Sequence, residues 1–182
     1  MKKVNVYLGE GFEEIEAITV EDLLRRGGVH VNTVAIGTSL TVTGAHGIPV
    51  VADSLLDDGV KEADGHVLPG GMPGTENLLL SAELKELMKR EARRGALIAA
   101  ICAAPSVLGR WGLLEGKKAT CYPGFEKFLD KASIQNTEVV VDGRTVTSRG
   151  AGTAMEFGLA LVEQLSGRAK MEDVRGGLLY KA

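Results

Sequence analysis

The stretch "ALIAAICAAPSVLG", residues 96–109, decides the fold and raises the question of function. Residues 96–101 form an apolar run with the length and composition of a buried strand, and residues 105–110 have the pattern of a helix that begins at a proline. One cysteine, Cys102, lies at the junction between them. A buried strand that passes directly into a helix is the basic unit of α/β proteins, so the stretch predicts that class.

Short apolar runs alternate with amphipathic segments along the rest of the chain. Strands are expected at residues 4–8, 29–36, 66–69, 96–101, 118–122 and 139–148, and helices at residues 14–26, 82–94, 105–110, 124–131 and 153–166. This alternation predicts a three-layer α/β/α sandwich with a mostly parallel sheet, because the connecting helices cover both faces. Hairpins are expected at Asp142-Gly143 and within residues 41–53. No linker-like segment divides the chain, so a single domain of residues 1–182 is predicted.

The composition excludes several classes of protein. Hydrophobic residues make up 45% of the chain, charged residues 25%, and the formal net charge is −3. Lysines and arginines are scattered, which argues against specific binding of nucleic acid. No apolar run reaches the ~18 residues of a membrane span and the first residues lack a signal peptide, so a cytoplasmic protein without membrane contact is expected. Cys102 and Cys121 lack the spacing of a zinc site, and neither a metal nor another cofactor is expected.

Cys102 has the local sequence of a nucleophile elbow, a tight strand-to-helix turn that needs small residues two positions before and after the nucleophile. Ala100 and Ala104 occupy those positions, and Pro105 suits the first position of the following helix. The free N–H groups at the start of that helix favour a thiolate. A pKa lowered from about 8.5 to about 5.5 would raise the ionised fraction at pH 7 from about 3% to about 97%. The alternative is that Cys102 is a small buried hydrophobe.

Glu16 begins the apolar stripe of the first expected helix, which continues through Leu23 and should face the sheet. Burial raises the pKa of a carboxyl group, so Glu16 is expected to stay protonated and to donate a hydrogen bond to the Cys102 sulfur. Glu21 and Arg25, four residues apart, are expected to form a solvated pair on the polar face. The alternative for Glu16 is a hydrated glutamate in a frayed first turn.

Two glycines follow the strand expected at residues 66–69. Gly70 and Gly71 leave the backbone there open to an anion, because they have no side chain. The N–H groups of Gly71 and of Ala103, the residue after the nucleophile, are therefore candidates for an oxyanion hole. A tight turn without any binding role is the alternative.

Five segments of the chain carry a family resemblance. They are "GFEEIEA", "VLPGG", "AAICAAPSVL", "ATCYPGFEKFL" and "TSRGAGTAMEFGLALVEQL". In this order and at this spacing they resemble the DJ-one/ThiJ/PfpI family, in the branch that contains the Parkinson's-disease protein deglycase and its bacterial relatives. The resemblance runs from the first expected strand to the last residues.

The resemblance implies a flavodoxin-like sandwich that forms a homodimer. It implies that Cys102 is the elbow thiolate and that Glu16 is its protonated carboxyl partner. It also implies that Gly71 and Ala103 supply backbone donors, while Gly70 shapes the turn. The activities that it implies are conversion of methylglyoxal to lactate without a cofactor, removal of early glycation adducts from proteins or nucleotides, oxidation of the cysteine to a sulfinate, and chaperone action.

The chain departs from the family pattern in its histidines. Members with hydrolytic chemistry have a histidine directly after the elbow cysteine, and the human-type branch has one before the proline that corresponds to Pro123. Here Ala103 and Tyr122 stand at those positions, so the sequence shows no obvious general base. Tyr122 either orients a substrate hydroxyl or carbonyl group or packs beside Phe125. The chain also lacks the histidine-x-glutamate pair of a glutamine amidotransferase.

Four other polar or reactive side chains have two interpretations each. His46 lies in a loop that either approaches the site or is simply solvated. Cys121 is either a resolving thiol or a buried, inert one. His30 and His66 lie in expected strands and are interpreted as structural or partly exposed.

These features predict a cysteine-dependent enzyme of carbonyl-stress or glycation defence. Its substrate would be a small α-oxoaldehyde or a glycated protein or nucleotide, attacked by the Cys102 thiolate. The alternative is a redox sensor or chaperone whose Cys102 is oxidised to a sulfinate without turnover. A third possibility is a scaffold with an inactive pocket and an ordinary thiol pKa.

Overall fold

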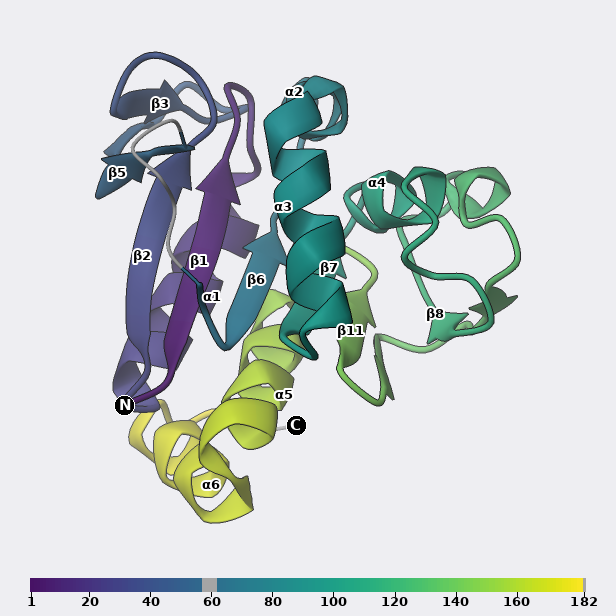
Figure 1. Ribbon diagram of the computed structural model, residues 1–182. Coiled ribbons are helices and arrows are strands. Elements are labelled where there is room, and N and C mark those ends of the chain that lie inside the picture. Colours follow the sequence, from purple (N-terminus) through teal and green to yellow (C-terminus); the bar gives the residue numbers. More distant parts are fainter. Residues whose placement is uncertain (57–61, 182) are drawn as a thin grey trace.

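The computed structural model describes residues 1–56 and 62–181. Its central strands are β1 (Lys3–Leu8), β2 (His30–Ala35), β5 (Ser54–Leu55), β6 (Gly65–Leu68), β7 (Leu97–Ile101), β10 (Val139–Asp142) and β11 (Thr145–Ser148). They form one sheet in the order β10-β11-β7-β6-β1-β2-β5 (Figure 1). Every neighbouring pair is parallel except β10 with β11. The expected mostly parallel sheet is confirmed.

Helices cover both faces of this sheet (Figure 1). One face carries α1 (Glu14–Arg26), α5 (Ala154–Ser166) and α6 (Arg168–Gly177), and the other carries α2 (Gly74–Leu80), α3 (Ala82–Arg93) and α4 (Pro105–Arg110). Each layer of helices encloses its own hydrophobic core against the sheet. None of the helices in the described part of the chain has both the length and the apolar character needed to cross a membrane.

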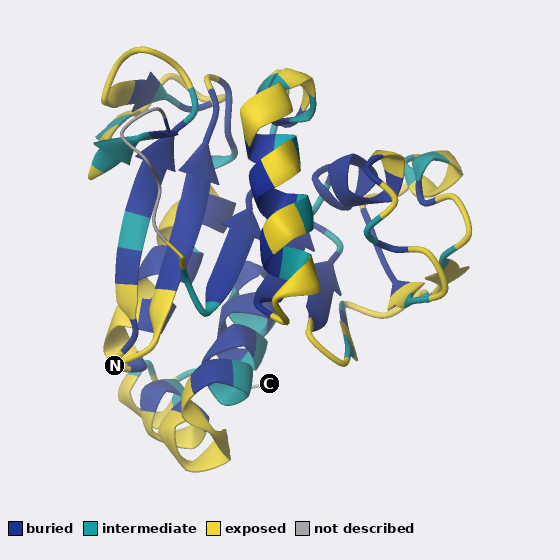
Figure 2. Cartoon of the chain, in the orientation of Figure 1, coloured by how far each residue is buried: buried dark blue, intermediate teal, exposed yellow. Residues whose placement is uncertain are grey.

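The two cores follow from the alternation of side chains along a strand. In β1, Val6 and Leu8 belong to the core under α1 and α5, whereas Tyr7 between them belongs to the core under α2 and α3. All three side chains are fully buried, and every residue of β6, β7 and β11 is buried as well (Figure 2). The three-layer α/β/α arrangement is therefore confirmed. That the whole chain forms one domain stays a prediction.

Two expected elements are wrong. The strand expected at 118–122 is only β8 (Lys118–Ala119), which pairs with β9 (Ser133–Ile134) in a separate small sheet. Beyond it, the N–H of Thr120 donates to the hydroxyl of Thr147 rather than to a strand ladder. The helix expected at 124–131 is only a short 3₁₀ turn at Glu126–Phe128, which lies between residues of positive φ, Gly124 at 95° and Lys131 at 61°.

Both expected hairpins are present. β10 and β11 are joined at Gly143, whose φ is 59°, and β3 (Thr41–Thr43) pairs with β4 (Pro49–Val51). The helices α2 and α6 and the short strand β5 were not predicted. They are short elements that tertiary packing stabilises more than local pattern does.

Glu21 and Arg25 do not form the expected solvated pair. Glu21 is buried, with only 8% of its surface exposed, and burial raises the pKa of its carboxyl group to about 7. The Arg25 guanidinium instead lies 3.6 Å from the carboxylate of Asp53, the residue before β5. The apolar face of α1 is therefore wider than its sequence pattern indicates.

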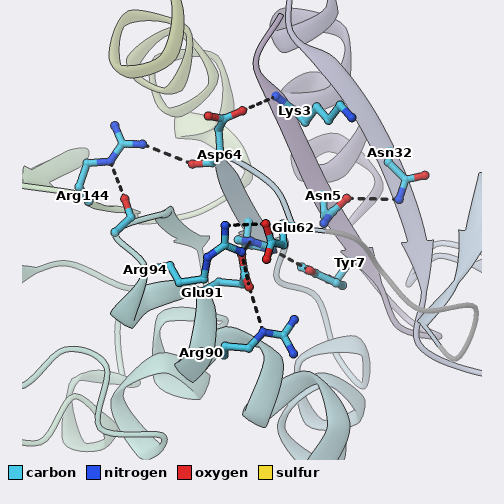
Figure 3. A network of polar contacts seen from close by, with 12 residues as sticks. Lys3, Asn5, Tyr7, Asn32, Glu62, Asp64, Arg90, Glu91, Arg94 and Arg144 are labelled. Carbon is cyan, nitrogen blue, oxygen red and sulfur yellow. Dashed lines mark hydrogen bonds and ion pairs between the residues drawn. The ribbon is translucent and has the colours of Figure 1, made fainter.

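A buried polar network joins β1, β6 and α3 (Figure 3). Tyr7 Oη lies 2.7 Å from His66 Nδ1, and His66 Nε2 lies 3.5 Å from the Glu91 carboxylate. Arg90 and Arg94 also contact the Glu91 carboxylate, each at 3.1 Å (Figure 3). Burial lowers the pKa of His66 to about 4, so the ring is neutral at pH 7. The structural interpretation of His66 is confirmed, and its position away from the carboxyl edge of the sheet separates it from the candidate site.

Candidate active site

Cys102 lies between β7 and α4 in a strained backbone conformation. Its φ is 65°, in the left-handed region that residues with a side chain rarely adopt. The N–H of Cys102 donates to the carbonyl of Ser148 at 3.0 Å, and its carbonyl accepts from the N–H of Tyr122 at 2.8 Å. Ala100 and Ala104, the small residues on either side, are fully buried. The strand-to-helix turn has the geometry of the predicted nucleophile elbow.

Glu16 extends from the first turn of α1 towards this elbow. Only 1% of its surface is exposed, and the N–H of Gly70 donates to Oε2 at 2.7 Å. Within the described part of the chain, no group donates a hydrogen bond of normal geometry to Oε1. Burial raises the pKa of Glu16 to about 7, and the Glu13 charge adds to the increase, while the Gly70 N–H and the Cys102 thiol oppose it. The expected buried carboxyl is present.

Gly70 and Gly71 form the wall opposite the cysteine. A Cβ at Gly70 would lie 2.7 Å from the Cys102 Cβ and 2.8 Å from Glu16 Oε2, so only glycine lets the two groups approach. Gly71 has a φ of 89°, and a Cβ there would overlap the backbone of Gly11 at 2.6 Å. The N–H groups of Gly71 and Ala103 donate to the Cys102 sulfur. The structure thus brings Cys102, Glu16, Gly70, Gly71 and Ala103 together. That they act as a catalytic pair with an oxyanion hole stays a prediction.

The pKa of Cys102 shifts in the direction opposite to the expectation. Burial and the neighbouring Glu16 carboxylate raise it to about 12, and the N–H groups of Ala103 and Gly71 only partly compensate. The helix that follows, α4, has six residues, so its dipole is small. The Glu16 carboxylate opposes ionisation of the thiol, whereas the hydrogen bond from the neutral thiol favours ionisation of the carboxyl group, so the two ionisations belong to the pair rather than to either residue.

Tyr122 and Cys121 flank the site. Tyr122 is half exposed, and its ring meets that of Phe125 edge to face at 6.5 Å, which fits the packing interpretation. Its N–H bond to the Cys102 carbonyl still places its backbone at the elbow. Cys121 is buried, and burial raises the pKa of its thiol to about 11, which fits an inert thiol better than a resolving one.

A second polar cluster was missed as a unit in the sequence. Glu13, Glu14 and His46 have ligand atoms within 4.8 Å of one another, close enough for a metal ion. Glu14, however, already accepts hydrogen bonds from the N–H groups of His46 at 2.8 Å and Ile48 at 3.4 Å and from His46 Nδ1 at 2.9 Å. Hydrogen bonding alone accounts for the arrangement. Its signal in the sequence was a histidine in a glycine-flanked turn, which gave no indication of its partners.

Gly71→Ala is expected to destabilise the fold by at least about 2 kcal/mol, because an alanine would be strained at this positive φ and its Cβ would overlap the backbone of Gly11. Denaturant unfolding of the purified variant measures the loss. Gly152→Ala is the matched control near the site, since no atom lies within 4 Å of the Cβ that it adds. Equal unfolding midpoints for the two variants would contradict the close packing of the turn.

The fold and the site define a class of proteins, the flavodoxin-like α/β proteins with a cysteine at a nucleophile elbow. This chain belongs to the DJ-1/PfpI family, whose family model matches residues 2–164. The family that the five sequence segments resemble is therefore confirmed.

Individual relatives match along almost the whole chain. Protein DJ-1 homolog B of Arabidopsis thaliana is 46% identical over 99% of this chain, although the match covers only 42% of that relative's length. A Caenorhabditis elegans protein named glutathione-independent glyoxalase DJR-1.2 is 38% identical over 88% of this chain and 87% of its own. The solved structure of oxidized Toxoplasma gondii DJ-1 has a TM-score of 0.95 and 36% identity, and the match covers 100% of both chains.

Proposed function

We propose that this protein is a cysteine-dependent enzyme of carbonyl-stress or glycation defence that needs no cofactor. Its substrates would be α-oxoaldehydes such as methylglyoxal, or their adducts on proteins or nucleotides. The observation that carries the proposal is the strained Cys102 elbow, with a buried carboxyl and two backbone N–H donors directed at one sulfur. The reducing cytoplasm, where thiols persist, suits this chemistry.

The working state of the pair has a thiolate on Cys102 and the proton on Glu16. Since Oε2 accepts the Gly70 N–H bond, Oε1 is the oxygen left to carry that proton. With the carboxyl neutral, its negative charge no longer adds to the effect of burial on the pKa of Cys102, and the O–H donates to the sulfur. The N–H groups of Gly71 and Ala103 then act on a negative sulfur, which strengthens their hydrogen bonds.

The proposed reaction is an internal oxidation and reduction. The thiolate adds to the aldehyde carbon of methylglyoxal, and the N–H groups of Gly71 and Ala103 stabilise the resulting oxyanion. Glu16 donates a proton to that oxygen and then takes the proton from the former aldehyde carbon, while the hydroxyl proton moves to the oxygen of the adjacent carbonyl group to give an enediolate. Glu16 next delivers its proton to the second carbon, and the first oxygen becomes the thioester carbonyl as the double bond shifts. The first carbon is oxidised to a thioester and the second is reduced to an alcohol. Water hydrolyses the thioester to lactate and frees Cys102.

Comparison with relatives supports both this proposal and its rival. The Caenorhabditis elegans relative is named a glutathione-independent glyoxalase, which supports turnover without an added thiol. The Toxoplasma gondii structure is described as oxidized, which keeps open the alternative of a redox sensor or chaperone. In that alternative Cys102 would become a sulfinate and Glu16 would donate a hydrogen bond to it.

A homodimer is the assembly that we propose, because apolar side chains remain exposed where α1 meets the β3–β4 hairpin. Ile15 and Ile18 on α1 are 56% and 42% exposed, and Ile48 on the hairpin turn is 55% exposed. The N–H of Ile48 donates to Glu14 of α1, so these side chains lie close together. Such an apolar patch suits self-association.

Purified protein is expected to convert methylglyoxal to lactate in the absence of glutathione and of added metal. The test follows loss of methylglyoxal and formation of lactate, with a chelator present throughout. Peroxide treatment followed by mass spectrometry is the parallel assay for the rival. No turnover above the buffer rate, together with rapid gain of two oxygen atoms at Cys102, would favour the sensor and overturn the enzyme.

A further inference from the structure

One carboxylate beside the Cys102–Glu16 pair has no role in the proposed reaction. Glu13 directly precedes α1, and Glu16 follows three residues later in its first turn. Residues three apart on a helix are neighbours, with Cβ atoms about 5–6 Å from each other. The side chain of Glu13 is 15% exposed and Glu16 is 1% exposed, so solvent screens their interaction only weakly. Glu13 is therefore placed to act on Glu16.

The backbone of Glu13 also fixes the turn that faces the Cys102 sulfur. The N–H of Glu13 donates to the carbonyl of Gly70 at 2.9 Å. The Gly70–Gly71 peptide is planar and trans, so its N–H points away from its carbonyl. That N–H, which belongs to Gly71, donates to the Cys102 sulfur. The hydrogen bond from Glu13 thus helps to aim the Gly71 donor at the sulfur.

The same turn holds the Glu16 carboxyl group. The N–H of Gly70 donates to Glu16 Oε2 at 2.7 Å, so Glu13 and Glu16 bind the two polar backbone groups of one residue. A Cβ at Gly71 would lie 2.4 Å from the Glu13 nitrogen, which shows how closely the start of α1 fits against the turn. Glu13, Glu16 and the Gly71 donor are therefore held as one unit.

The Glu13 charge acts unequally on the two groups of the pair. It raises the pKa of Glu16, whereas the main influences on the pKa of Cys102 are burial, Glu16 and the N–H groups of Ala103 and Gly71. Glu13 consequently repels a negative charge on Glu16 more than it repels one on the sulfur. Between its two ionisations the pair holds a single negative charge. Glu13 favours the distribution in which that charge lies on the sulfur.

The other charged groups around Glu13 leave this repulsion in place once His46 is neutral. His46 Nδ1 lies 3.7 Å from Glu13 Oε2 but closer to Glu14, at 2.9 Å. The Glu10 carboxylate, on the loop before α1, accepts the N–H of Thr43 on the hairpin. While His46 is protonated it offsets part of the Glu13 charge. The full charge acts above the pKa of His46, which the hydrogen bond to Glu14 and the charges of Glu13 and Glu14 raise.

We propose that Glu13 is a positioning residue that keeps the proton of the pair on Glu16 and the negative charge on the Cys102 sulfur. This inference rests on the proposed function, whose working state is that pair. As the state forms, the S–H bond of Cys102 breaks and its electron pair stays on the sulfur, while the proton forms an O–H bond at Glu16 Oε1. The reverse transfer would place a second negative charge beside Glu13.

Glu13→Gln is expected to lower the pH at which Glu16 loses its proton, because the variant removes the charge and keeps the N–H bond to Gly70. Carbon NMR of labelled glutamate and cysteine side chains, followed against pH, measures the midpoints of Glu16 and Cys102 separately. The Glu16 midpoint should move further than the Cys102 midpoint. On the alkaline limb of the pH profile, kcat for methylglyoxal should fall at least about twofold, with KM unchanged.

Two further variants separate the charge of Glu13 from its packing. Glu13→Asp retains the charge and should keep most of the wild-type midpoint and profile, a rescue that a purely structural role would not give. Glu10→Gln is the matched control, because it removes an exposed carboxylate of the preceding loop that is not among the groups shifting the pKa of Glu16. It should leave both midpoints unchanged. Unfolding midpoints verify that each variant is folded.

The outcomes separate this inference from the proposed function. An unchanged Glu16 midpoint in Glu13→Gln, or equal movement of the Glu16 and Cys102 midpoints, overturns the role of Glu13 while Cys102-dependent turnover still supports the enzyme. Absence of methylglyoxal turnover in the wild type overturns the proposed function instead, and the NMR midpoints still decide whether Glu13 directs the charge of the pair.

Discussion

Cys102→Ala is expected to reduce methylglyoxal turnover by at least about 10³-fold, because the variant has no atom that can form the covalent hemithioacetal. The remaining rate would come from binding and from the N–H donors at Gly71 and Ala103. Lactate formation without glutathione measures the loss. The unfolding midpoint should change little, since alanine experiences the same left-handed backbone strain as cysteine at this φ of 65°.

Cys121→Ala is the control for this substitution. Cys121 is the other thiol of the chain, it is 3% exposed, and burial raises its pKa to about 11. The Cys121→Ala variant should keep turnover close to that of the wild type. In the wild type, Cys121 should remain unmodified by methylglyoxal. Full activity in Cys102→Ala, or equal losses in the two variants, would show that the sulfur of Cys102 is not the nucleophile.

The sequence predicted the core of the fold because its signals there are local. The apolar run 97–101, Pro105 and the Asp142-Gly143 turn each determine their own segment, and the helix 105–110 is found at its predicted bounds. The strand expected at 118–122 failed for the opposite reason. Its residues are β-prone, but the partners of that segment are the Thr147 side chain and the Cys102 carbonyl, which no local pattern reveals.

In the candidate site, too, some features follow from the local sequence and others depend on distant residues. The positions of Cys102, Glu16 and Gly71 follow from an elbow, a helical stripe and a glycine turn, all readable from nearby residues. The sign of the Cys102 pKa shift depends on the charge of a residue 86 positions away and on how deeply the sulfur is buried. The His46–Glu14 contact likewise joins residues 32 positions apart. Such quantities emerge only when the chain is folded.

Glu16→Gln is expected to lower turnover by about 10²-fold or more, because an amide cannot carry protons between oxygen and carbon. Its effect on the thiol distinguishes two distributions of charge in the pair. If the proton stays on Glu16 and Cys102 ionises first, Glu16→Gln replaces one neutral hydrogen-bond donor to the Cys102 sulfur, the carboxyl O–H, by another, the amide N–H. The pH midpoint of alkylation should then lie below the ordinary thiol value of about 8.5 in both proteins.

The opposite distribution predicts the opposite change. If Glu16 ionises first, at its pKa of about 7, the thiol of the wild type stays neutral until about pH 12. Glu16→Gln then removes a negative charge beside the thiol, which lowers the pH midpoint of alkylation and speeds alkylation between about pH 7 and about pH 12. Glu21→Gln is the control, because it removes a second carboxyl on α1 whose pKa burial also raises to about 7, outside the site. A variant Glu16→Gln that is alkylated faster than the wild type near pH 9, while Glu21→Gln is not, would therefore place the carboxylate beside a protonated sulfur and exclude the thiolate mechanism.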